Sequence, residues 1–168
     1  MTEIVKVFRD EVPAMRFIGK KYPDFGPWWG DWFANGWFDR IEEAMGGPDA
    51  ILKIWENGGG YVGLERRAKG KPFEYWIGMF TPAGTPAPDG FEALDLPAGA
   101  FVTCWIRGPE GEVHTAIPGC TEAVRAAGFA LRPDADGYAV SFENGLCPRF
   151  TTPDEDGNVI LDYCFLAE

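Results

Sequence analysis

The stretch DLPAGAFVTCWIRGP, residues 95–109, indicates the fold of this chain most clearly. Its acid-x-Pro-Ala opening also occurs in EVPAMRF, residues 11–17, which begins 84 positions earlier (95 minus 11), half the length of the 168-residue chain. In both places Pro-Ala separates two short β-forming runs. Proline fixes φ and lacks an amide hydrogen, so it suits the start or edge of a strand. The two copies predict a duplicated unit, each half opening on a strand that bends and continues.

The composition indicates a globular protein without a nucleic-acid partner. Hydrophobic residues make up 46% and charged residues 24% of the chain, which is ordinary for a soluble globular domain. A net charge of −11 opposes a phosphate backbone, so direct nucleic-acid binding is not expected. The same charge suits a cationic small molecule as the partner. The sequence does not indicate an oligomeric state.

The four cysteines, Cys104, Cys120, Cys147 and Cys164, are scattered, and the chain has a single histidine, His114. A zinc site would require closely spaced pairs of such ligands. We therefore expect buried, reduced thiols in a cytoplasmic protein, with no metal site and no cofactor. The first residues do not resemble a signal peptide, and no apolar run approaches the roughly 18 residues of a membrane span, so no membrane partner is expected.

Periodicity along the chain predicts the order strand, helix, strand, strand, given twice. The first repeat, about 1–81, contains strands at 4–9 and 15–22, a helix at 27–45 and a hairpin of strands 61–67 and 73–80. A linker follows at about 82–90. The second repeat, about 91–168, contains strands at 91–96 and 100–107, a helix at 118–128 and strands at 138–143 and 159–166. We expect one α+β domain over 1–168, with two antiparallel sheets, each carrying a helix on one side, that meet across a pseudo-two-fold axis. The helix-free faces would then form a ligand cleft.

The predicted helix 27–45 has an unusually aromatic face. It carries four of the seven tryptophans, Trp28, Trp29, Trp32 and Trp37. Two interpretations stay open: the face packs on a sheet, or one or two rings overhang a pocket.

Glu143 is the candidate for chemistry. Alternation on strand 138–143 places Ala139, Ser141 and Glu143 on one side. A carboxylate among small neighbours indicates open space, because a core position would not tolerate it without a partner. If Tyr61, Trp76 and Trp105 line the same cleft, the site is an aromatic box with one acid. Trp37, Phe101 and Ser141 are further candidate ligand-binding residues.

Such a box favours flat, hydrophobic and often cationic molecules through apolar burial and cation–π attraction. It also suits hydrolysis, because apolar surroundings raise the pKa of a carboxylate and so prepare Glu143 as a general base. A Tyr hydroxyl or a Trp N–H would hold the substrate's carbonyl. For His114 we expect a surface or hydrogen-bonding role. Arg149 is expected to pair with the loop acids Asp154, Glu155 or Asp156.

These features together resemble a known family. The repeated acid-x-Pro-Ala opening, the hairpin carrying Tyr61 and Phe73, the turn at 96–99 and the strand at 138–143 are similar to the GyrI-like small-molecule-binding domain. That domain is also the effector-binding part of AraC-type and MerR-type multidrug-sensing regulators of bacteria. The resemblance covers almost the whole chain. It implies two β-α-β-β repeats of the SHS2 type around a cleft, Glu143 as the ligand-binding acid, and pocket aromatics at Tyr61, Trp76 and Trp105.

The resemblance implies three alternative functions. Some stand-alone members are hydrolases that open the cyclopropane of DNA-alkylating natural products, with the acid as base beside aromatic residues. By this likeness Glu143 and Tyr61 are the catalytic residues of a detoxifying enzyme, which is the hypothesis we favour from sequence. The second is a non-catalytic module that binds or senses aromatic, cationic compounds. The third is an interaction protein that inhibits a larger enzyme such as gyrase.

Overall fold

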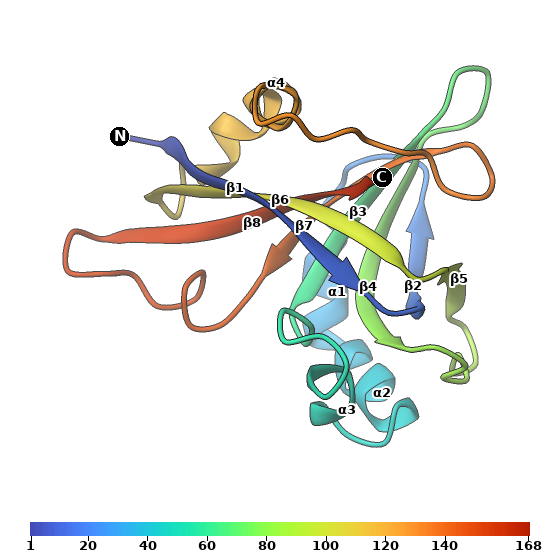
Figure 1. The fold of residues 1–168 in the computed structure, drawn as a ribbon. Helices are drawn as coiled ribbons and strands as arrows, with labels where there is room; N and C mark the ends of the chain where they lie inside the picture. The colour runs from blue at the N-terminus through green and yellow to red at the C-terminus, as the bar shows by residue number, and fades with distance from the viewer.

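The structure, a computed structural model, describes all residues 1–168 and has an α+β architecture with one antiparallel sheet of eight strands (Figure 1). The strands are β1 (Glu3–Val12), β2 (Met15–Tyr22), β3 (Tyr61–Arg67), β4 (Glu74–Pro82), β5 (Glu92–Leu96), β6 (Gly99–Pro109), β7 (Ala139–Gly145) and β8 (Asn158–Ala167). The helical segments are α1 (Trp29–Ala34), α2 (Trp37–Ala44), α3 (Asp49–Leu52), the 3-10 helix η1 (Val113–Gly119) and α4 (Cys120–Ala126).

At the two Pro-Ala bends, each half of the chain contributes one strand to the other half of the sheet. The strand order is β1-β6-β8-β7-β3-β4-β2-β5, so β1 pairs with β6 at one edge and β5 pairs with β2 at the other. Val12 lies opposite Gly99 on one side of the bends, and Met15 lies opposite Leu96 on the other. Both pairs belong to one antiparallel register. The bends at Pro13 and Pro97 are therefore neighbours, and through them the chain passes from one half to the other.

The α+β class is confirmed, but the expectation of two separate sheets is wrong. At the centre β3 pairs with β7 from Tyr61↔Gly145 to Arg67↔Ala139, which joins the halves into one sheet. The sheet is strongly curved, because Phe80 on β4 and Phe101 on β6 have ring centroids 5.6 Å apart although three strands separate them in the order. Their shared side is the inner face of the sheet, and the other side is its outer face.

The inner face is filled by a hydrophobic core. Phe142 lies 5.0 Å from Phe80 and 5.1 Å from Phe101 between ring centroids, and Trp55, which follows α3, packs edge-on against both Phe80 and Phe101. The face without the longer helices is therefore packed solid. The cleft expected there does not form, because curvature brings its rings into contact with one another.

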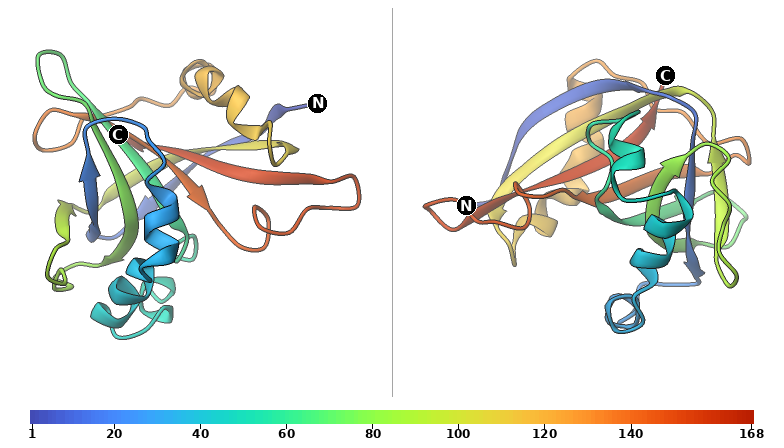
Figure 2. Two further views of the ribbon diagram at one scale, coloured as in Figure 1. Left: turned by 180° about the vertical axis from the view of Figure 1, so that it is seen from behind. Right: turned by 90° about the horizontal axis from the view of Figure 1, so that it is seen from below.

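The outer face carries the longer helical segments at opposite ends of the molecule (Figure 2). One cluster packs α1 and α2 on β2 and β4 around Trp32, which is fully buried. A second cluster packs η1 and α4 on β6 and β8, with Val124 at its centre. The aromatic face of residues 27–45 thus mainly covers the sheet, as the first of the two interpretations held.

The helices are shorter than the sequence predicts. The expected helix 27–45 is divided into α1 and α2 at Asn35 and Gly36, where Gly36 adopts a left-handed φ of 62°. The expected helix 118–128 begins instead as a 3-10 helix with Pro118 inside it and becomes α-helical only at Cys120. The spacing of apolar residues reveals neither interruption, because the apolar stripe continues through both.

Three of the four cysteines are buried thiols, and Cys147 is exposed, contrary to its expected burial. All four are free. None of the helices has the length and apolar character that crossing a lipid bilayer requires.

A glycine pair sets the close approach of β2 and β4. Gly19 lies opposite Gly78, and a Cβ on Gly78 would overlap the carbonyl oxygen of Ile18. We expect Gly78→Ala to lower the free energy of unfolding by about 2 kcal/mol, because backbone has to move to accommodate the methyl group. Gly30→Ala, in α1 with no atom within 4 Å of the added Cβ, should instead raise it by about 0.4–1 kcal/mol, because alanine loses less backbone entropy on folding than glycine. Urea denaturation followed by circular dichroism measures both; equal effects would show that the approach is not tight.

Candidate functional site

Glu143 occupies the centre of the outer face. On β7 it lies opposite Gly63 of β3 and Tyr163 of β8. A Cβ on Gly63 would lie 3.1 Å from Oε1 of Glu143 and 2.7 Å from the hydroxyl oxygen of Tyr75. The absence of a side chain at Gly63 therefore leaves room for the carboxylate. Its side chain is 27% exposed, so it lies neither in the core nor in bulk solvent.

His114 is the one protein partner of the Glu143 carboxylate. Nε2 of His114, in η1, lies 3.1 Å from Oε2 of Glu143. The hydrogen bond to Glu143 raises the pKa of His114, and the partial burial of the ring opposes this increase. The ion pair stabilises the fold fully below the ordinary histidine pKa of about 6.5, and this contribution is lost as the pH rises through the raised value.

Aromatic rings wall the larger cavity beside this pair. The cavity measures about 480 Å³, and its lining includes Trp29, Phe33, Tyr61 and Phe150 together with Glu143 and His114. The Tyr61 ring stacks on Phe38 with centroids 3.8 Å apart and planes inclined by 2°, which fixes its orientation. Burial raises the pKa of Tyr61, so its phenol is neutral at physiological pH.

A second cavity, of about 230 Å³, adjoins the first at Glu143 and His114, and its lining includes Tyr75, Tyr163 and Glu65. Trp29 Nε1 donates to the Tyr75 hydroxyl at 2.9 Å. Burial raises the pKa of Tyr75 to about 12 and raises that of Tyr163 as well. Burial also raises the pKa of Glu65, although a hydrogen bond from Arg67 opposes it. We call these two adjoining cavities the central groove.

The expected aromatic box around Glu143 does not form. Tyr61 lines the groove with Glu143, but Trp76, Trp105 and Phe101 lie on the inner face. Strand register decides this, because residues directly opposite each other point to the same face. Trp76 lies opposite Leu64, the chain neighbour of Gly63. Trp105 lies opposite Asp162, and Asp162 lies opposite Asn144, the chain neighbour of Glu143. Neighbours in a strand point to opposite faces, so these residues point away from Glu143.

The other expected residues lie near the groove or away from it. Ser141 shares the outer face and accepts a hydrogen bond from Tyr163 at 3.0 Å, but it lines the next cavity along β7. Trp37 packs edge-on against Trp32 at 5.5 Å and does not line the groove. Arg149 pairs with Asp162 at 2.7 Å and not with the loop acids, and Arg107 is the partner of Asp154.

Several groove residues were not among the site residues expected from sequence, including Phe33, Phe150 and Glu65. His114 was expected only to lie at the surface or form a hydrogen bond, and the structure places it on Glu143. Trp29 lines the groove as one of the overhanging rings left open as an alternative. Tyr75 and Tyr163 were assigned to no site. The alternation of β4 contained the signal for Tyr75, because pairing Glu65 with Tyr75 places them on one face.

No protein-family model and no curated protein matches the sequence, whereas solved structures share its fold. A Staphylococcus aureus MU50 protein named for bacterial transcription regulation has a TM-score of 0.64 at 11% identity, over 97% of this chain and 98% of its own. SAV2435, solved bound to tetraphenylphosphonium, has a TM-score of 0.57 at 13% identity, over 98% and 94%. A hydrolase encoded by lin2189 from Listeria innocua has a TM-score of 0.51 at 10% identity, over 97% and 92%. At these identities the likeness establishes a common fold.

The single histidine gives a direct test of the His114–Glu143 pair. In Glu143→Gln the carboxylate is lost, so the pKa of His114 should fall, because the hydrogen bond and charge that raise it are removed while the partial burial that lowers it remains. The Hε1 resonance of His114, followed by NMR against pH, reports this value without overlap from other histidines. Glu112→Gln, which removes an exposed acid two residues from His114, is the control and should leave the pKa unchanged. An unchanged pKa in Glu143→Gln would show that the two groups do not pair.

Proposed function

We propose that the central groove binds a lipophilic aromatic cation and that the chain is a small-molecule-binding module of the GyrI-like type. One observation carries the proposal: a partly buried carboxylate with a single protein partner, His114, borders a cavity of about 480 Å³ walled by aromatic rings. The volume lies within the range of cavities that hold drug-sized molecules.

The groove offers a cation two kinds of attraction. Glu143 supplies a full negative charge where partial burial reduces screening by solvent. The faces of Trp29, Tyr61 and Phe33 carry partial negative charge, which attracts a cation at short range. The apolar parts of these rings also bury hydrophobic substituents. A delocalised aromatic cation satisfies all three demands, whereas a small hydrated ion would gain little from the rings.

His114 competes with the ligand for Glu143. When protonated, the imidazole already neutralises the carboxylate, so an incoming cation has to displace it or share it. As the pH rises through the raised pKa of His114, the ring loses its charge and Glu143 becomes available. Affinity for the cation should therefore increase with pH over this range, because binding is linked to release of a proton. Glu65, Tyr75 and Tyr163 face the same pair, and the two phenols stay neutral there.

The common fold with SAV2435 supports tetraphenylphosphonium as the first ligand to test. At pH 6 we expect Glu143→Gln to weaken its binding about tenfold, the equivalent of about 1.4 kcal/mol, because the variant keeps the shape and removes the charge. His114→Gln should strengthen binding at the same pH, because it removes the competing cation. Isothermal titration calorimetry measures both dissociation constants.

Glu92→Gln is the matched control for loss of one negative charge, because Glu92 is exposed on β5 at the edge of the sheet. It should change the affinity less than twofold. If Glu143→Gln and Glu92→Gln behave alike, attraction by net charge explains the binding and the proposed site is wrong.

Hydrolysis is the second candidate function, favoured by the position of a carboxylate beside neutral phenols. Glu143 would take a proton from a water molecule while the oxygen of that water forms a bond to a cyclopropane carbon. The ring carbon–carbon bond breaks and its electron pair moves to a conjugated carbonyl oxygen, to which the hydroxyl of Tyr61 would donate a hydrogen bond. That oxygen then gains a proton from solvent, and Glu143 releases the proton that it took from water, so the product carries one added water. The fold shared with the Listeria innocua hydrolase is compatible with this chemistry.

Incubation with a cyclopropane-bearing DNA alkylator, followed by mass spectrometry, tests the enzyme hypothesis. A product heavier by one water should appear faster than without protein, and Glu143→Gln should slow its formation at least about a hundredfold, the usual lower contribution of a general base. If the alkylator is recovered intact while tetraphenylphosphonium binds, the chain is a binding module only.

A further inference from the structure

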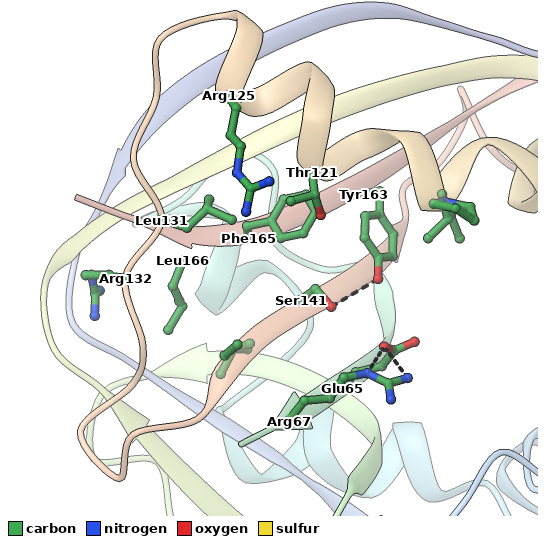
Figure 3. A pocket seen from close by; sticks show the side chains of 14 residues that line it. Glu65, Arg67, Thr121, Arg125, Leu131, Arg132, Ser141, Tyr163, Phe165 and Leu166 are labelled. Carbon is green, nitrogen blue, oxygen red and sulfur yellow. Dashed lines mark hydrogen bonds and ion pairs between the residues drawn. The ribbon is translucent and has the colours of Figure 1, made fainter. Parts of the chain in front are cut away.

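A third cavity, of about 430 Å³, lies on the outer face beyond the central groove and has the opposite charge character (Figure 3). Glu65, Ile117 and Tyr163 line both this cavity and the groove, so the two are continuous. Three arginines also line it: Arg67 at the end of β3, Arg125 on α4 and Arg132 after α4. We call this cavity the arginine pocket.

Two of these arginines have no carboxylate partner. The chain has nine arginines, and six of them form ion pairs. The other three are Arg40, Arg125 and Arg132. Arg132 donates through Nε to the carbonyl of Ala167. The guanidinium group of Arg125 makes neither a hydrogen bond nor an ion pair with the protein, although the backbone carbonyl of Arg125 accepts from the Gly128 amide. In a chain with 26 acidic residues, two unpaired guanidinium groups at one cavity are an unusual concentration of positive charge.

The floor of the pocket is apolar, with hydroxyl groups beside it. Figure 3 shows Arg125 extending from α4 toward Leu131 and Phe165. Leu131 is 36% exposed, and Phe165 is buried. Ser141 accepts a hydrogen bond from Tyr163, so its own hydroxyl hydrogen is free to donate. The Thr121 hydroxyl also lines the cavity and has no protein partner.

We propose that the arginine pocket binds an amphipathic organic anion, such as a carboxylate or sulfonate on an apolar body. Arg125 binds the charged head, since guanidinium groups form charge-assisted hydrogen bonds with such oxygens. Arg132, whose guanidinium group lies beside Gly99 and donates to the carbonyl of Ala167, adds positive charge at the far end of the pocket. Leu131 and Phe165 cover the apolar body, and the free hydroxyls donate to the head. Glu65, held by Arg67, lies at the boundary with the groove and directs the head toward the outer arginines. The arginine pocket is therefore a site for anions, whereas the central groove is a site for cations.

The test compares two fluorescent probes that differ in charge. The anionic 8-anilinonaphthalene-1-sulfonate should bind saturably to the wild-type protein, and decanoate should displace it. In the double variant Arg125→Gln, Arg132→Gln its dissociation constant should rise at least about tenfold. The neutral analogue N-phenyl-1-naphthylamine, which lacks the sulfonate, should bind both proteins within twofold. Arg125→Lys keeps a charge and should restore part of the affinity for the anion.

Two control variants separate this pocket from the central groove. Arg40→Gln removes the third arginine without an ion pair, on α2, and should leave the anionic probe unaffected. Glu143→Gln should also leave the dissociation constant of the anionic probe within twofold of the wild-type value. The anion site is therefore tested independently of cation binding in the groove. Equal affinity of the anionic probe for the wild type and the double arginine variant overturns the proposal. An equal loss of affinity for the anionic and the neutral probe overturns it as well, because the arginines would then not distinguish a charged ligand from an uncharged one.

Discussion

Two neighbouring bends, at Pro13 and Pro97, hold the halves of this protein in one arrangement. Each proline interrupts a strand at the point where its chain leaves one half of the sheet for the other, and the paired residues on both sides keep one antiparallel register. Because β1 completes the second half and β5 the first, neither half can form its full set of hydrogen bonds alone. The curvature of the joined sheet brings Phe80, Phe101 and Phe142 together on the inner face.

That packing determines where a ligand can enter. The inner face is closed by its own aromatic side chains, so open space is left on the outer face between the two helical covers. The central pairing of β3 with β7 places Gly63 opposite Glu143, and the missing side chain leaves room beside the carboxylate. Farther along the same face the charge reverses at Arg125 and Arg132. One continuous surface thus presents an acidic, aromatic section and a basic, apolar section.

The sequence was sufficient for the strands and for the side of the sheet that Glu143 shares with Ser141. Alternation located β3 at its observed bounds and assigned Glu143 and Ser141 to one face. Side chains alternate between the two faces of any strand, so this assignment needs no knowledge of the neighbouring strands. The sequence was insufficient for the aromatic partners. Whether Tyr61 shares a face with Trp76 or with Tyr75 depends on how the turn between β3 and β4 sets their register, and a shift of one residue exchanges the two faces.

His114 could not be assigned to Glu143 from sequence for a related reason. It lies in a 3-10 segment whose position depends on packing against β6 and β8, and no motif connects it to β7, 29 positions later (143 minus 114). The closure of the inner face depends likewise on contacts between distant residues. The helix break at Gly36 is local, a left-handed glycine at the end of α1, and the continuous apolar stripe concealed it. Local patterns therefore predicted the parts, and the curvature of the joined sheet decided which of them meet.

A crystal structure of the protein with tetraphenylphosphonium would locate the ligand site. We expect the phosphonium on the outer face, with its nearest carboxylate at Glu143, its phenyl groups against Trp29 and Tyr61, and His114 displaced from Glu143. Density for the ligand on the inner face, between Trp76 and Trp105, would rule out the central groove as its site. A ligand on the outer face that leaves the His114–Glu143 contact intact and lies against neither ring would do the same.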